Sequence, residues 1–304
     1  MRKFCILLVC LLLAGCGDWP FGKDDWDGPD SGNPAIWHVT AEGSPDGRSG
    51  EAWLFGSIHA LPRTLEWQGG RLPDVMQASD RLVLEITGLE DRAAIAATFR
   101  KMGSSPNQPD LAERIEPALH AEAARLQERG KLSDDRFATM ESWAAALTFA
   151  SIASSGLSIS SDSGVERTLT DAFERMEKPV QALETAELQF SYFDRLPESA
   201  QRQMLASVIG EADNARQGYR DLVTAWLTGD VGKLGKATRG SMLASKDLRE
   251  AVLVARNRDW AGKIDAMIVR GERPLVAVGA AHLAGSGSVQ SLLEERGYRV
   301  ERIQ

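Results

Sequence analysis

Two distant segments of this chain share a pattern that is typical of a strand ending at a histidine. "AWLFGSIHALP" (52–62) and "PLVAVGAAHLAG" (274–285) each run from apolar residues into Gly-x-x-His. The chain contains only four histidines, and the pattern places two of them, His59 and His282, at strand ends. Because the carboxyl ends of strands in layered α/β folds converge on one edge of the sheet, we expect the two histidines to lie close together.

Further strand-like and helical segments predict the fold class. Residues 35–43 and 51–59 are joined by "SPDGRSG", whose Asp46-Gly47 pair is typical of a hairpin turn. Other strand candidates are 80–87, 178–185, 273–282 and 298–303, and long amphipathic segments cover 110–130, 141–156 and 197–229. This order predicts an α/β domain, with α+β as the alternative, built on a small mixed sheet with many flanking helices.

The first residues predict export and lipidation. "MRKFCILLVCLLLAG" (1–15) joins two cations to an apolar core that is short for a membrane span, which is typical of a secretion signal. It ends in "LAGC", the processing box of bacterial lipoproteins, so Cys16 is predicted to carry lipid. An ordinary signal peptide or a short anchor helix is the alternative. Gly17 after the cysteine favours the outer membrane, facing the periplasm, although Asp18 weakens this preference.

The chain therefore divides into three parts: a lipoprotein signal peptide (1–15), a lipidated cysteine with a flexible tether (16–35) and one globular domain (36–304). The tether is rich in Gly, Pro and Asp and has no helical or strand periodicity. We expect the protein to be lipid-anchored in the cell envelope, with the membrane as a partner through that anchor.

Composition excludes several classes of function. The three cysteines are Cys5, Cys10 and Cys16, and the first two leave with the signal, so disulfides, thiolate catalysis and cysteine-ligated metals are excluded. Loss of Arg2 and Lys3 takes the formal net charge from −8 to −10. This charge argues against nucleic acid as a partner and against electrostatic binding to anionic lipid.

Carboxylates stand at two other strand ends. Glu85 lies inside the apolar run "LVLEI", where an unpaired carboxylate would be costly, and Glu184 ends the 178–185 strand. Together with His59 and His282 they would form a nitrogen and oxygen site for a divalent cation, with positions open to water and substrate. The competing interpretation is that each histidine is a hydrogen-bonded structural residue.

The motif glycines and the turn after the second motif have plausible roles at such a site. Gly56 and Gly279 would let the backbone turn sharply or let a neighbour approach closely. The glycine-rich turn after His282 could offer free N–H groups to an anionic group. The other histidines, His38 and His120, are predicted to be structural or solvent-facing.

Taken together, the ordered motifs resemble the TraB/GumN family, which includes the Tiki metalloproteases. The resemblance rests on both Gly-x-x-His segments, "LVLEI", "GVERTLTDAFERMEKPVQALETAELQFSYFDRLP" and "ARNRDWAGKI", and it spans about 36–303. It implies an EreA/ChaN-like and Tiki-like fold and a divalent-metal-dependent, peptidase-like hydrolase. The wider superfamily is linked to erythromycin esterases and to a haem-binding lipoprotein.

The resemblance also implies a site. His59 and His282 would be ligands of manganese, cobalt or zinc or, without a metal, the general acid and base. Glu85 would be a third ligand or would deprotonate the attacking water. A second set is expected to bind substrate: Glu184, Arg256 and Asn257. Arg256 and Asn257 could hold a substrate carboxylate or polarise a carbonyl, or could equally form an ion pair or cap on a helix surface.

Two classes of function therefore remain open. The first is a lipid-anchored, metal-dependent hydrolase acting on a peptide or small-molecule substrate. The second is a non-catalytic envelope protein that binds haem or a peptide, with a histidine as axial iron ligand in the case of haem. Hydrolysis requires Glu85 next to the reacting groups, whereas a haem site tolerates apolar surroundings.

Overall fold

The computed structural model describes residues 26–41, 50–89, 91–155, 157, 159–237 and 245–304. The predicted signal peptide, Cys16, most of the tether and the Asp46-Gly47 turn lie outside the described residues. Among the residues described, no helix combines the length and the apolarity that crossing a membrane requires.

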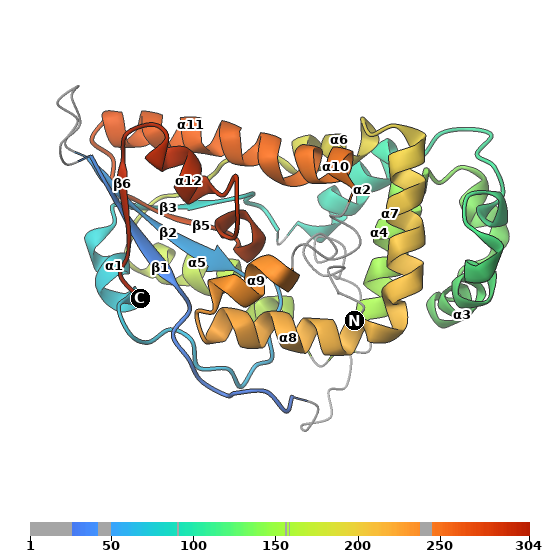
Figure 1. The fold of residues 1–304 in the computed structure, drawn as a ribbon, viewed down its shortest axis with the longest axis horizontal. Helices are drawn as coiled ribbons and strands as arrows, with labels where there is room; N and C mark the ends of the chain where they lie inside the picture. The colour runs from blue at the N-terminus through green and yellow to red at the C-terminus, as the bar shows by residue number, and fades with distance from the viewer. Residues whose placement is uncertain (1–25, 42–49, 90, 156, 158, 238–244) are drawn as a thin grey trace.

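A mixed sheet of six strands forms the centre of the described part of the chain (Figure 1). The strands follow the order β4-β3-β5-β2-β1-β6 across the sheet. The four strands β4, β3, β5 and β2 are parallel, and β1 is antiparallel to both β2 and β6. Their bounds are β1 Ile36–Thr40, β2 Glu51–Ser57, β3 Arg81–Leu84, β4 Val180–Ala182, β5 Pro274–Gly279 and β6 Arg299–Arg302. This sheet and its helices confirm the predicted mixed α/β fold.

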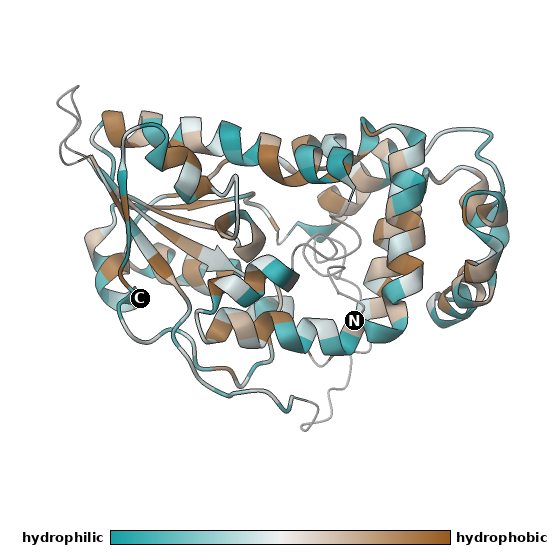
Figure 2. Ribbon diagram, in the orientation of Figure 1, coloured by the Kyte–Doolittle hydropathy of each residue, from teal (hydrophilic) through white to brown (hydrophobic). Residues whose placement is uncertain are grey.

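The central strands are apolar on both faces because helices cover both faces of the sheet (Figure 2). Alternate side chains of β5 point to opposite faces, so that Leu275 and Ala277 join one core while Val276 and Val278 join another. The side chains of strand β2 alternate between the same two cores. Continuous apolar runs were therefore the correct signal for these two strands.

Two groups of helices pack on these faces. Helices α11 (Ala255–Val269) and α12 (Val289–Glu294) cover one face, where Trp260 and Ile264 pack against the sheet. The other face is covered by α1 (Leu72–Ala78), α5 (Val165–Arg175), α8 (Ala215–Leu227) and α9 (Val231–Ala237). Figure 1 shows both groups, with the sheet between them.

A helical layer with its own core lies beyond the sheet edge toward which β2 points (Figure 1). Its core contains Trp143, Phe190 and Leu205. The layer consists of α2 (Arg92–Met102), α3 (His120–Gly130), α4 (Ser142–Ser154), α6 (Ala186–Asp194), α7 (Glu198–Glu211) and α10 (Lys246–Arg249). It places helices opposite the carboxyl ends of the parallel strands.

Three predicted elements have different bounds in the structure. The segment 110–130 begins with 3₁₀ turns, and the α-helix starts only at His120, because Pro117 lacks the N–H that an earlier start would use. The predicted helix 197–229 is interrupted at Ala212–Asn214 by a 3₁₀ turn. Strand β4 is short because Thr185 already caps α6, its hydroxyl accepting from the amide of Leu188 at 3.1 Å.

Candidate functional site

The residues that follow the four parallel strands lie at one edge of the sheet. Glu85 directly follows β3 and Glu184 lies two residues after β4. His59 lies two residues after β2, and His282 lies on the 3₁₀ turn (Ala280–Leu283) that follows β5. Helix α11 adds Arg256 to this edge. The structure thus brings five of the predicted site residues to the carboxyl ends of the strands.

Arg256 lies at the centre of a buried ionic network. Its Nη2 donates to Oε2 of Glu85 at 2.7 Å and to Oε2 of Glu184 at 2.8 Å. Its Nε donates to both oxygens of Glu184 at 3.1 Å. The guanidinium also stacks over the ring of Trp260, 4.6 Å from its centroid. The two carboxylates therefore share one cation, and their negative charges raise the pKa of Arg256 despite its burial.

Both oxygens of Glu85 already accept hydrogen bonds. Oε1 accepts from the amide of Gly279 at 2.7 Å, and Oε2 accepts from the side-chain amide of Gln189 at 3.1 Å in addition to Arg256. Burial raises the pKa of Glu85, but Arg256 first, and then His282 and His59, outweigh burial and lower the pKa to about 2. Glu85 is therefore an anion at neutral pH.

The two motif glycines stand at points of close packing. A Cβ on Gly279 would lie 3.0 Å from Oε1 of Glu85, which the amide of Gly279 binds. A Cβ on Gly56 would lie 3.2 Å from both the Cα and the Cβ of Ala280, in the turn that carries His282. Gly56 therefore lets the turn that carries His282 come within contact distance, and Gly279 does the same for the carboxylate of Glu85.

His282 is neutral and its tautomer is determined by its partners. Oδ1 of Asn257 accepts from Nδ1 of His282 at 2.5 Å, while Nδ2 of Asn257 donates to the carbonyl of Gly287 at 2.7 Å. Nη1 of Arg256 lies 3.3 Å from Nε2 of His282, and since a guanidinium can only donate, Nε2 carries the lone pair. Burial, only partly offset by Glu85, lowers the pKa of His282 to about 3.

His59 has a carboxylate partner that sequence analysis did not assign. Oε1 of Glu166, on α5, lies 2.7 Å from Nδ1 of His59, as a close ion pair that is not a well-aligned hydrogen bond. Burial lowers the pKa of His59, but Glu166 outweighs burial and the pKa rises to about 9. His59 is therefore a cation at neutral pH, in contrast to His282.

A backbone contact positions Glu166 for this role. The amide of Val165 donates to the carbonyl of Ile58 at 3.1 Å, which fixes the start of α5 against the segment that follows β2. Glu166, Leu169 and Phe173 are spaced at intervals of a helical turn and are all buried. An acid on the apolar face of the helix in "GVERTLTDAF" was the sequence signal that could have identified Glu166.

Several buried polar atoms gather around the carboxylate of Glu166 without well-aligned hydrogen bonds between them. They are Oγ of Ser57, Nδ1 of His59 and both carboxylate oxygens of Glu166. Because the hydroxyl of Ser57 and the ring of His59 both help to lower the pKa of Glu166, these groups are one another's partners. The Glu85 and Glu184 side of the site is held instead by Arg256.

The two sides influence each other electrostatically. The charge on His59 helps to lower the pKa of both Glu85 and His282, and Glu85 in turn helps to raise the pKa of His59. The other histidines make different contacts: Nε2 of His38 pairs with Glu51 at 2.6 Å, and Nε2 of His120 contacts the carbonyl of Ala112 at 3.0 Å.

The predicted metal ligands fit a divalent cation only in part. Two imidazoles whose Nδ1 atoms are held by a carboxylate and an amide have the usual surroundings of metal-binding histidines. Glu85, by contrast, has both oxygens engaged. Among the described residues, no three His, Cys, Asp or Glu side chains are arranged to hold a metal ion. Of the two imidazoles, only His59 leaves Nε2 uncommitted, because Nε2 of His282 faces Nη1 of Arg256 at 3.3 Å. The oxygen donors of the prediction are likewise committed to Arg256.

Comparison with known proteins identifies the family. The model of the TraB/PrgY/gumN family matches residues 35–302. The chain belongs to this family. It is similar to the protein YbaP of Shigella flexneri, described as uncharacterized, with 24% identity over 262 residues that cover 86% of this chain and 94% of that protein. YbaP of Escherichia coli K12, described in the same way, is 25% identical over 240 residues, 79% of this chain and 86% of its own length. No solved structure matches the chain significantly.

Proposed function

We propose that this chain is a hydrolase of the cell envelope, anchored by lipid on Cys16, and that His59 and His282 carry its chemistry. The observation that supports the proposal most directly is that each of the two imidazole rings has a polar partner at Nδ1. Glu166 contacts Nδ1 of His59, and Asn257 accepts from Nδ1 of His282. Holding Nδ1 in this way orients each ring and leaves Nε2 of His59 for the reaction, while Nε2 of His282 faces Nη1 of Arg256 at 3.3 Å.

The opposite charge states of the histidines suit proton transfer. With a pKa of about 9, His59 is protonated at neutral pH and can donate a proton to a leaving group. With a pKa of about 3, His282 stays neutral and its Nε2 can accept a hydrogen bond or act as a ligand. Neighbouring groups whose pKa values are driven apart are a recurring feature of acid–base sites.

A divalent cation, manganese, cobalt or zinc, remains part of the proposal, with Nε2 of His59 and Nε2 of His282 as its protein donors. Nε2 of His282 would have to exchange its contact with Arg256 for the cation. Such an ion would supply a coordinated water of lowered pKa as the nucleophile. His282 is already neutral, whereas His59 must release a proton before it can act as a donor. Cation binding is therefore expected to strengthen as the pH rises.

We assign positioning roles to the residues first expected to bind metal or substrate directly. Glu85 and Glu184 hold Arg256, and Glu85 also holds the amide of Gly279 at the end of β5. Asn257 fixes the ring of His282. These groups set the geometry of the strand ends, and the substrate is a peptide or small molecule.

Calorimetric titration of the metal-free full-length protein in detergent tests the cation. Binding near one equivalent of manganese, cobalt or zinc is expected, and His59→Ala and His282→Ala should each abolish it. Glu166→Gln, which removes the charge that keeps His59 protonated, should shift the rise of cation binding with pH to lower pH. His120→Ala, at an exposed histidine, is the matched control and should bind like the parent.

Hydrolysis of a panel of fluorogenic peptides and esters by the same variants tests the activity. Loss of turnover in both motif variants with retained cation binding would assign the histidines as acid and base and reject the cation. Turnover that depends on neither histidine would overturn the hydrolase proposal.

The haem-binding alternative is not supported by the surroundings of His282. Glu85, Glu184 and Arg256 place three charged groups beside this ring, whereas a haem site requires an apolar slot. A Soret band in the purified protein would reverse this preference.

A further inference from the structure

We propose that the hydroxyl of Tyr192, on α6, donates a hydrogen bond to a carbonyl oxygen of the substrate. The inference rests on the proposed hydrolase function, since it names a substrate-binding group of the same site and the chemistry that this group recognises. Its support comes from the residues first expected to bind substrate, from the contacts of Tyr192 itself and from the charges around it.

The residues first expected to bind substrate are committed to other partners. Nε and Nη2 of Arg256 donate to the two carboxylates of the network, while Nη1 donates to the carbonyl of Val252 at 3.2 Å and faces Nε2 of His282 at 3.3 Å. Every N–H group of this guanidinium is thus engaged. Asn257 is fully buried with both ends of its side-chain amide bonded, and the side chain of Glu184 has no exposed surface. A substrate must therefore meet this network through another group.

Tyr192 lies at the edge of the same network. Helix α6 belongs to the helical layer opposite the strand ends, and there it presents Gln189, which donates to Glu85, and Tyr192 one turn later. The guanidinium of Arg256 lies over the ring of Tyr192, 5.6 Å from its centroid. Tyr192 is partly exposed, in contrast to the buried residues of the network, so its side chain meets solvent.

The hydroxyl of Tyr192 is only weakly held. It donates to Oε1 of Glu184 at 3.2 Å, which is longer than the usual range of about 2.5–3.0 Å between a hydroxyl donor and an oxygen acceptor. Glu184 does not depend on this bond, because Trp260 donates to the same oxygen at 2.8 Å and Arg256 donates to both oxygens. The hydroxyl can therefore turn to a substrate without leaving a buried carboxylate unpaired.

The other two tyrosines of the chain differ in both respects. Tyr219 is buried and donates to the carbonyl of Ala60 at 2.7 Å. Tyr298 is buried and donates to Oδ1 of Asp265 at 2.5 Å. A partly exposed hydroxyl with a long hydrogen bond is thus particular to Tyr192.

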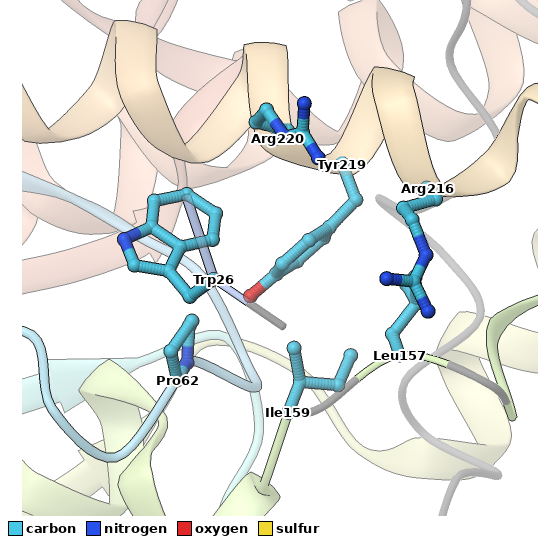
Figure 3. Close-up of a pocket in the computed structure, with 7 residues that line it drawn as sticks. All are labelled: Trp26, Pro62, Leu157, Ile159, Arg216, Tyr219 and Arg220. Atoms are coloured by element: carbon cyan, nitrogen blue, oxygen red, sulfur yellow. The ribbon is translucent and has the colours of Figure 1, made fainter. Parts of the chain in front are cut away.

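The hollow beside Tyr219 is not an alternative place for a substrate. Figure 3 shows Trp26 and Pro62 facing the ring of Tyr219 across this hollow. The cavity volume is about 20 Å³, which is room for about one water molecule. Arg220 at its rim is already paired with Asp27 at 2.6 Å. The chain itself fills this hollow and leaves no space for a substrate group.

The charges around Tyr192 favour a neutral oxygen over a carboxylate. Glu85 and Glu184 outnumber the single guanidinium of Arg256, so an anionic group would be repelled. The phenol of Tyr192 stays protonated at neutral pH, because burial first, and then Glu184, raise its pKa to about 12. A neutral donor of this kind suits the carbonyl of a peptide or an ester, and it binds more strongly as negative charge develops on that oxygen.

The first test is binding without turnover, measured by 19F NMR on the full-length protein in detergent with 3-fluorotyrosine at its three tyrosines. The protein carries His59→Ala so that the peptides stay intact. N-acetyl-Ala-Ala-Ala-amide offers only carbonyl oxygens, and N-acetyl-Ala-Ala-Ala adds a carboxylate. The amide should shift the signal of Tyr192, assigned by its loss in Tyr192→Phe, and should leave those of Tyr219 and Tyr298 in place. An unshifted Tyr192 signal, or tighter binding of the peptide with the carboxylate, would overturn the proposal.

A substitution that removes only the hydroxyl locates the donor. In the same background, Tyr192→Phe should weaken binding of N-acetyl-Ala-Ala-Ala-amide by about two- to tenfold, the loss expected for one hydrogen bond. The melting temperature should stay close to that of the parent, because Glu184 keeps its other partners. Tyr298→Phe, which removes a hydroxyl that donates to Asp265, is the matched control and should bind like the parent. Equal affinities of the two variants would reject the role of Tyr192.

Hydrolysis of the fluorogenic peptides and esters separates this role from a structural one. In Tyr192→Phe without the His59 substitution, kcat should fall by about 100-fold, more than KM rises, because the donor acts most strongly on the charge that develops during the reaction. Cation binding should not change. Parent-like values of kcat and KM would contradict the proposal.

These experiments distinguish Tyr192 from the proposed function. Peptide binding that depends on Tyr192, in a protein that hydrolyses nothing, supports the donor and rejects the hydrolase. Hydrolysis with parent-like kinetics in Tyr192→Phe rejects the donor and leaves the hydrolase standing.

Discussion

The amide of Val165 donates to the carbonyl of Ile58 at 3.1 Å, and this bond joins the start of α5 to the end of β2. The contact places Glu166 within 2.7 Å of Nδ1 of His59. A helix that covers one face of the sheet therefore also supplies the acidic partner of a strand-end histidine. The charge state of His59 depends on how this helix is docked.

Glu166→Gln should lower the pKa of His59. The parent value of about 9 depends mainly on the Glu166 carboxylate, and without it burial is opposed only by the smaller effect of Glu85, so the pKa should fall. Histidine titration followed by NMR measures the change. Glu174→Gln, at an exposed position of the same helix, should leave the titration of His59 unchanged. A parent-like pKa in Glu166→Gln would show that another group charges the ring.

Arg256→Ala should lower the free energy of unfolding by about 3–5 kcal/mol, because it leaves Glu85 and Glu184 buried without their cation. Urea denaturation measures the loss. Arg258→Ala is the comparison on the same helix: this arginine pairs with Glu250 at the surface, and its removal should cost less than about 1 kcal/mol. Equal effects of the two substitutions would mean that the network around Arg256 contributes no more than a surface pair.

Stability should be greatest near pH 6.5 and fall on both sides. The raised pKa of His59 gives stability that is complete below pH 6.5 and is lost as the pH rises through about 9. The lowered pKa of His282 gives stability that is complete above pH 6.5 and is lost toward pH 3. The lowered pKa of Glu85 adds a loss between pH 4.5 and about 2.

Melting temperatures measured between pH 3 and pH 10 test this profile. His59→Gln should flatten the alkaline limb, while His120→Gln, at an exposed histidine, should keep the profile of the parent. An alkaline limb that persists in His59→Gln would assign it to a different group.

Gly279→Ala should destabilise the protein by about 1–3 kcal/mol, because the new methyl group would lie 3.0 Å from Oε1 of Glu85 and force that carboxylate to move. Thermal unfolding measures the effect. The matched change is Gly262→Ala in α11, where the added Cβ meets only an arginine side chain at 3.5 Å. There a gain of up to about 1 kcal/mol is expected from helix propensity. A neutral Gly279→Ala would show that Glu85 relaxes without cost.

Cys16→Ser should abolish labelling by radioactive palmitate and should remove the protein from the detergent phase on phase separation. The reason is that the "LAGC" box predicts a lipid on this cysteine. Cys10→Ser, inside the predicted signal, is the control and should still be labelled. Continued labelling of the Cys16 variant would reject the lipoprotein assignment.

Local sequence patterns predicted the fold class and about half of the residues of the candidate site. Apolar runs identified β2 and β5, and reading the residues just beyond each strand located His59, Glu85 and His282, because strand direction alone places such residues at one edge. Glu166 was missed because its role depends on how α5 docks on the segment after β2, which no local pattern specifies.

The role of Arg256 could not be read from a local sequence pattern either. Its position on a helix allowed either a substrate-binding group or an ion pair at a helix surface. Its partners, Glu85 and Glu184, follow two different strands. Only the packing of α11 across the strand ends determines that the arginine is buried between them.

The place of β5 within the sheet controls when the site can exist. This strand comes near the end of the chain, yet it lies between β3 and β2, which come near the beginning. The chain emerges with its N-terminus first, so β2 and β3 each have an unpaired edge until β5 has been made. Pairing between strands so far apart in the sequence is also slow. His59 and Glu85 therefore remain without His282 until almost the whole chain has emerged. A partly synthesised or truncated chain therefore holds only an incomplete candidate site.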